Sequence, residues 1–219
     1  MYYSLHILMF SLLLISCQST IEKAEIFLEQ GDFKRSIHNF NKALDEEPES
    51  LEARLGLGKS LLQKAMYLNE NNRDREEDWE NTVHELNIIH QQLNNNETKE
   101  LLSYSLLFLS KKIIGRGDTL LGIKKLEKLL EQDFNHVEAR NYKAIIHHDL
   151  GDFQTAIDLF LENTVIDSLS SSASFNLGML YWQDEDYLTA YEWWIKAFEI
   201  SPQDKETAYW MLQAEKKLK

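Results

Sequence analysis

The sequence predicts an all-α protein built from repeated helix-turn-helix units, and three observations support this. The 219 residues include only 8 glycines and 2 prolines, and the stretches between them are rich in helix-favouring Leu, Glu, Lys, Ala and Gln. The chain also resembles itself at a period of about 34 residues. Because 43% of the residues are hydrophobic and 27% are charged, the chain can bury a core and is not a disordered tail.

The charge balance argues against two classes of partner. The formal net charge is −13, and such a surface repels nucleic-acid phosphates and anionic lipid headgroups. No long basic run offsets this charge, so we expect no nucleic-acid binding. Contact with a membrane would then need apolar insertion or a covalent lipid, since charge attraction is absent.

The first element, residues 1–16, contains no Asp, Glu, Lys or Arg. Its apolar centre, residues 5–15, is much shorter than the roughly 20 residues that a spanning helix needs. This length is typical of the apolar region of an export signal, which is removed from the mature protein. We therefore predict a signal peptide over residues 1–16.

The motif Leu14-Ile15-Ser16-Cys17 follows, and it contains the only cysteine of the chain. It resembles the lipobox of bacterial lipoproteins: an aliphatic residue, a tolerant position, a small residue and cysteine. The resemblance implies cleavage before Cys17, a diacylglyceryl group on its thiol, and anchoring in a membrane of the bacterial cell envelope. Gln18 is compatible with the outer membrane, on its periplasmic side. One departure from the pattern is that the first residues contain His6 but no Lys or Arg.

Other roles for Cys17 have less support. A catalytic thiol needs an electropositive pocket and a positioned histidine, and nothing beside Cys17 supplies either. An intramolecular disulfide lacks a second cysteine. A buried or bystander cysteine on an N-terminal helix is the alternative. The spacing of Ser19 and Glu22 fits a capping box, which predicts that the first helix begins within a few residues of Cys17.

Four blocks of the sequence align with one another: 29–48, 115–134, 149–168 and 183–202. The last three blocks follow one another at intervals of one period, whereas the first precedes the second by more than two periods. Within the blocks a glycine is expected to end one helix, and an aspartate to cap the next. A small residue lets the two helices approach, and a large one four positions later fills the space between them. The recurring residues are Gly31, Gly117 and Gly151; Asp32, Asp118, Asp152 and Asp186; Ser36, Gly122, Ala156 and Ala190; and Phe40, Leu126, Phe160 and Trp194.

This pattern resembles the tetratricopeptide repeat, a helix-turn-helix unit of about 34 residues. The resemblance implies an α-solenoid, a right-handed superhelix in which Gly58 and Gly178 are small positions of first helices. The predicted repeats are 17–50, 51–102, 103–136, 137–170 and 171–204, followed by a capping helix at 205–219. The second repeat is longer than one period, and we interpret the excess as a polar surface insertion at 69–78 followed by a long helix that ends at 94–97. A dedicated docking loop is the alternative.

Catalytic and metal-binding motifs are scarce. The segment VHELNIIH is similar to a zinc-protease helix, but His84 and His90 are six positions apart and project from different faces. There is no glycine-rich phosphate loop, nucleophile elbow or Cys/His cluster. We therefore expect a non-enzymatic protein with no metal and no cofactor.

The resemblance also implies a concave groove lined by the first helix of each repeat, where a protein or peptide binds. The groove positions that carry over to this chain are Asn141, Ile145, His148, Phe175, Met179, Trp182, Tyr209 and Gln213. Aromatic anchors are typical of such binding surfaces. The alternative is that these rings pack between repeats, as we expect for Trp193, Trp194 and Trp210.

The predicted function is a lipid-anchored adaptor or scaffold that binds a protein or peptide partner in the bacterial cell envelope. One alternative is a glycan- or cell-wall-binding module in which Trp182 and its neighbours form a stacking platform. Another is an α-solenoid subunit of a wall hydrolase, against which the lack of a separate catalytic domain weighs.

Overall fold

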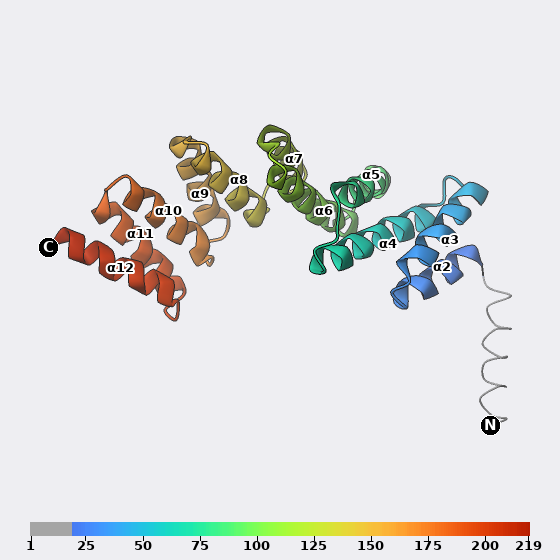
Figure 1. Cartoon of the computed structure of the whole chain (residues 1–219), viewed down its shortest axis with the longest axis horizontal. Coiled ribbons are helices and arrows are strands. Elements are labelled where there is room, and N and C mark those ends of the chain that lie inside the picture. The colour runs from blue at the N-terminus through green and yellow to red at the C-terminus, as the bar shows by residue number, and fades with distance from the viewer. Residues whose placement is uncertain (1–18) are drawn as a thin grey trace, which may run out of the picture. The chain divides into compact units, whose positions relative to one another are not determined.

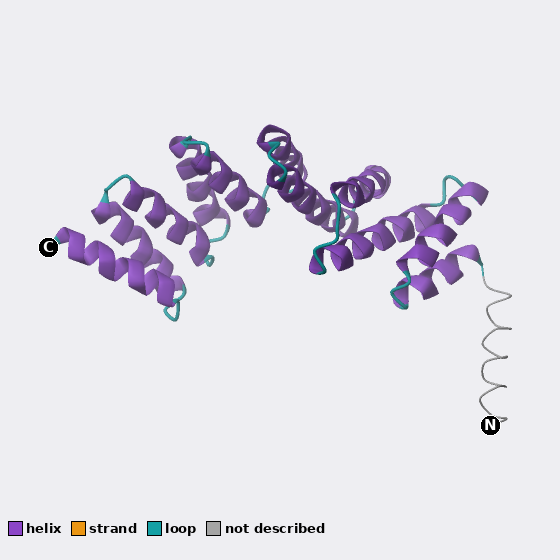
Figure 2. Ribbon diagram, viewed as in Figure 1, coloured by secondary structure: helices purple, strands orange, loops and turns teal. Residues whose placement is uncertain are grey.

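The computed structural model describes residues 19–219, all of which lie in helices or in the loops that join them (Figure 2). The predicted signal peptide at 1–16 and Cys17 lie outside the described residues. The described chain forms eleven helices, labelled in Figure 1, which confirms the predicted all-α fold. Their bounds are α2 (Thr20–Glu29), α3 (Phe33–Glu46), α4 (Leu51–Glu70), α5 (Glu76–Leu93), α6 (Asn96–Gly115), α7 (Thr119–Gln132), α8 (Val137–Asp149), α9 (Phe153–Ile166), α10 (Ser171–Gln183), α11 (Tyr187–Ile200) and α12 (Lys205–Leu218).

The chain divides into two compact units. Unit 1 ends at Asp118 and contains helices α2 to α6, and unit 2 begins at Thr119 and contains α7 to α12. Within each unit, helices that follow one another pack together, and an apolar core forms among three consecutive helices, as at α2, α3 and α4 and again at α8, α9 and α10. Such stacking of short helical pairs is the architecture of an α-solenoid.

The turns inside the hairpins form as the repeated residues predict. Gly31 and Gly151 have φ values of 72° and 81°, a left-handed conformation in which a side chain is unfavourable. The next residue caps the following helix: Asp32 accepts from the Arg35 amide at 3.0 Å, and Asp152 accepts from the Thr155 amide at 3.3 Å. The hydrogen bonds to Thr155 lower the pKa of Asp152 below its ordinary value.

The small and large positions of the repeat meet inside the hairpins. Ala190 and Trp194 are fully buried, and a Cβ atom added at Gly178 would lie 2.6 Å from the Trp194 Cδ1 atom. A Cβ added at Gly58 would lie 2.7 Å from the Leu86 Cδ2 atom. Distances this short leave no room for a methyl group, so both glycines allow close approach of two helices.

The excess length of the second predicted repeat extends three consecutive helices of unit 1. Helices α4, α5 and α6 have 20, 18 and 20 residues, whereas those of unit 2 have 13 or 14. The polar segment predicted at 69–78 is therefore wrong in extent, because only residues 71–75 separate α4 from α5. The predicted boundary between residues 102 and 103 falls inside α6, which begins at Asn96.

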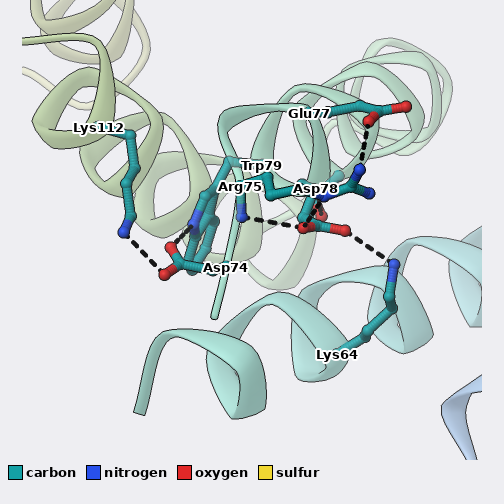
Figure 3. Close-up of polar contacts among 8 residues, drawn as sticks. Lys64, Asp74, Arg75, Glu77, Asp78, Trp79 and Lys112 are labelled. Atoms are coloured by element: carbon teal, nitrogen blue, oxygen red, sulfur yellow. Dashed lines mark hydrogen bonds and ion pairs between the residues drawn. The ribbon is translucent and has the colours of Figure 1, made fainter. Parts of the chain in front are cut away.

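Two buried carboxylates hold the short loop at 71–75 in place (Figure 3). The side chain of Asp74 is 1% exposed; it accepts from Lys112 Nζ and from Trp79 Nε1, both at 2.7 Å. The side chain of Asp78 is 4% exposed and accepts from Lys64 Nζ at 2.8 Å. Burial favours a raised pKa for Asp78, but its hydrogen bonds to Lys64 and to the Arg75 amide outweigh burial, and the pKa lies below its ordinary value. The loop thus ties α4, α5 and α6 together.

Candidate functional site

The eight predicted groove residues all lie in unit 2, on the first helix of successive hairpins and on the capping helix. Helix α8 contributes Asn141, Ile145 and His148; α10 contributes Phe175, Met179 and Trp182; and α12 contributes Tyr209 and Gln213. Spacings of three and four residues place the members from each helix on one side of that helix. We call the surface made by these eight residues the first-helix face.

Polar contacts join α8 to α10 along this face. Asn141 Nδ2 donates to Ser172 Oγ at 3.3 Å, and Asn141 Oδ1 accepts from Asn163 Nδ2 of α9 at 2.7 Å. Two turns further along α8, His148 Nε2 lies 2.5 Å from Gln183 Oε1 at the end of α10. Asn141 and His148 are therefore held beside α10, as a shared surface requires.

Aromatic contacts join α10 to α12. The Trp182 ring lies 5.6 Å from the Trp210 ring and 5.9 Å from the Trp194 ring, measured between centroids. Phe175, Met179 and Trp182 are half-buried against the core that Ala190, Trp194 and Ala214 form. These three groove residues thus contribute to packing between helices and also border the surface.

Two groove residues remain open to solvent. Ile145 is 42% exposed and Tyr209 is 55% exposed. Tyr209 also packs edge-on against Trp210, with 5.4 Å between ring centroids, which restricts its orientation. A partner can contact these two side chains without displacing a core residue. Exposed apolar anchors supported by a packed core are suited to binding another protein.

The three other tryptophans of unit 2 are placed as the sequence predicts. Trp194 is fully buried, and its Nε1 donates to the Phe175 carbonyl at 3.1 Å. Trp210 packs in the same cluster, and Trp193 packs against the core between α9 and α10. All three rings therefore serve packing between repeats.

Two concave pockets were not predicted from the sequence. One in unit 2, of about 310 Å³, lies between α9 and α10 and includes Phe153 and Ile157. The other, in unit 1, has about 710 Å³ and includes Phe33 and Ile37. The shared tripeptide Gly-Asp-Phe at 31–33 and 151–153 is the signal that could have located them, because its phenylalanine begins the second helix of each hairpin.

The chemistry available on residues 19–219 is limited. This part of the chain has no group of three or more His, Cys, Asp or Glu side chains placed to hold a metal ion. His84 is exposed on α5, and His90 Nδ1 lies 2.8 Å from Thr98 Oγ1, so the two do not converge. No helix over the same residues has the length and apolar character needed to cross a membrane.

Comparison with known proteins identifies the repeats. Residues 21–65 and 171–204 match models of the tetratricopeptide repeat, and the second range has the same bounds as one predicted repeat. No curated protein matches the chain.

Solved structures with a similar fold cover nearly the whole chain. YrrB, described as a TPR protein with an unusual peptide-binding site, has a TM-score of 0.55 at 20% identity and covers 90% of each chain. The C-terminal part of a TPR protein from Cytophaga hutchinsonii has a TM-score of 0.61 at 15% identity, over 90% of this chain and 71% of that one. Yeast Tom70 has a TM-score of 0.56 at 16% identity, over 89% of this chain and 57% of that one. These likenesses show the fold.

Proposed function

From the tetratricopeptide repeats that this chain contains, we propose that it is a non-enzymatic adaptor, anchored by lipid in the bacterial cell envelope, that holds a protein or peptide partner. The first-helix face of unit 2 is the binding surface. The observation that supports it most is the pair of exposed apolar side chains on this face, Ile145 on α8 and Tyr209 on α12, of which Tyr209 packs edge-on against the half-buried Trp210. YrrB, a structural neighbour, is described as having a peptide-binding site.

The proposed anchor rests on the lipobox and on the start of the first helix. Ser19 Oγ accepts from the Glu22 amide at 3.1 Å, and Glu22 Oε2 accepts from the Ser19 amide at 2.8 Å, which is the predicted capping box. Helix α2 therefore begins at Thr20, three residues after Cys17. Three extended residues span about 10 Å. A lipid on Cys17 would hold α2 close to the bilayer, facing the periplasm if the anchor lies in the outer membrane.

The alternative of a glycan-binding platform is less well supported by the ring contacts. A sugar ring stacks on an open aromatic face. The Trp182 ring contacts the rings of Tyr187, Trp194 and Trp210, at centroid distances of 4.8, 5.9 and 5.6 Å. Trp182 thus packs against three other rings, and the open positions of the face, Ile145 and Tyr209, favour a protein partner.

Charge introduced at Tyr209 is expected to disrupt partner binding. We expect Tyr209→Arg to lower the amount of partner recovered in a pull-down from solubilised membranes by about tenfold, because an exposed aromatic anchor is lost. The matched control is Leu188→Arg: Leu188 lies on the second helix α11 and is 56% exposed, against 55% for Tyr209. Circular dichroism checks that both variants keep their helix content. Equal recovery with the two variants would exclude the first-helix face as the binding surface.

A further inference from the structure

The pocket in unit 1 lies between the turn that joins α2 to α3 and the C-terminal half of α4. Its apolar lining comes from Phe33 and Ile37 on α3 and from Tyr67 and Leu68 on α4. The rings of Phe33 and Tyr67 lie 6.0 Å apart, and Tyr67 is 49% exposed. A volume of about 710 Å³ is large enough for one or two apolar side chains.

The charged groups around this pocket favour an anion. Lys34 and Lys64 both line it. Lys64 is bonded to Asp78; Lys34 is exposed, joins no residue in 19–219 by a hydrogen bond or ion pair, and acts on Asp32 through its charge alone. Among residues 19–219, the acidic residue that lines the pocket is Asp32. Its Oδ1 accepts from the Arg35 amide at 3.0 Å, and its Oδ2 accepts from Arg35 Nε at 2.6 Å. A local excess of positive charge therefore borders an apolar floor on a chain of net charge −13.

We propose that this pocket is a second binding site, for a protein segment in which a large apolar side chain stands next to Asp or Glu. The apolar side chain lies on the floor made by Phe33, Ile37, Tyr67 and Leu68, and the carboxylate pairs with Lys34. A small free ligand would have to be mostly enclosed to bind well, and this pocket is open on one side. A side chain presented by another protein has no such requirement, since the surrounding interface excludes the water.

This proposal does not depend on the first-helix face, because none of its residues belongs to unit 2. The excess of positive charge beside the pocket also makes its binding selective. A basic segment of a partner is repelled by Lys34, and it is attracted by the acidic surface elsewhere on the chain. The pocket thus discriminates by charge among apolar segments.

The test is selection from a phage-displayed library of linear dodecapeptides on the purified full-length protein, followed by affinity measurement with the best synthetic peptide. We expect the selected peptides to share an aromatic or aliphatic residue next to Asp or Glu. Affinity should fall about tenfold in Lys34→Glu, and less in Lys34→Gln, because reversal repels the carboxylate while neutralisation only removes the attraction. The control Lys42→Glu changes the net charge equally on the same helix and should leave affinity unchanged.

Three results would overturn the proposal: no shared apolar–acidic pair among the peptides, equal affinity for wild type and Lys34→Glu, or equal losses in Lys34→Glu and Lys42→Glu. Tyr209→Arg is measured in parallel. A peptide that loses affinity only in Tyr209→Arg binds the first-helix face, which supports the proposed function and contradicts the second site. A peptide affected only by Lys34→Glu supports the second site whatever the outcome for the first-helix face.

Discussion

Replacement of Cys17 by alanine is expected to move the protein from the membrane fraction to the soluble fraction. Each buried CH₂ of an acyl chain contributes about 0.8 kcal/mol to membrane binding, and two chains are sufficient for stable anchoring. The acidic surface of net charge −13 supplies no attraction of its own to anionic lipids. The measurement is incorporation of labelled fatty acid, followed by fractionation of the cells.

The matched control for this experiment is Gln18→Ala, which leaves the thiol and the preceding lipobox residues unchanged. It should incorporate the label and sediment with membranes as wild type does. If Cys17→Ala stays in the membrane fraction, or if wild type takes up no label, the lipid anchor is wrong. The repeat fold and the first-helix face would be unaffected by that result.

The second large effect is expected when Lys112 is replaced by methionine. Asp74 is 1% exposed, and its charge is balanced by Lys112, whose side chain is 35% exposed. Removal of one partner from a buried pair costs about 3–5 kcal/mol. Because Lys112 is partly solvated, we expect the free energy of unfolding to fall by about 2–3 kcal/mol. Urea denaturation followed by circular dichroism measures this change.

A second substitution separates charge from packing. Asp74→Asn in the Lys112→Met background removes the unpaired carboxylate and keeps an oxygen that can accept from Trp79 Nε1, so it should restore at least part of the lost stability. Lys42→Met is the surface control, because Lys42 is 58% exposed and its ion pair with Glu46 has a distance of 3.9 Å; it should change stability by less than about 0.5 kcal/mol. Equal stability of Lys112→Met and Lys42→Met would show that the loop at 71–75 does not depend on this pair.

The sequence predicted most accurately the features that depend on neighbouring residues. The turn at Gly151 and the N-cap at Asp152 involve only a few consecutive residues. The types of these residues and their order are therefore enough to locate both features. The close approach at Gly178 was also predictable, because the repeat places a small residue opposite a large one. The match to a tetratricopeptide-repeat model at 171–204 includes Gly178.

The features that were missed depend on contacts between distant residues. The polar run at 69–78 has the composition of a loop, yet α4 continues to Glu70 and α5 begins at Glu76. The burial of Asp74 requires Lys112, which is 38 residues away in the sequence. Charge patterning along one segment could not reveal that pairing.

At the first-helix face, too, the sequence predicted the local feature but not the contacts between helices. The helical period correctly placed Phe175, Met179 and Trp182 on one side of α10. Whether those side chains are free or packed depends on Trp194 and Trp210, which come from other helices. The sequence therefore left the choice between groove and core open, and the structure shows side chains that border both.

Photocrosslinking in native membranes tests most directly the central claim, that the first-helix face holds a protein partner. A benzophenone amino acid is placed at Tyr209 in one strain and at Leu188 in another, positions of 55% and 56% exposure on α12 and α11. After irradiation, we expect a defined protein adduct from Tyr209 and none from Leu188. The absence of a protein adduct at Tyr209, or the same adduct from both positions, would contradict the claim.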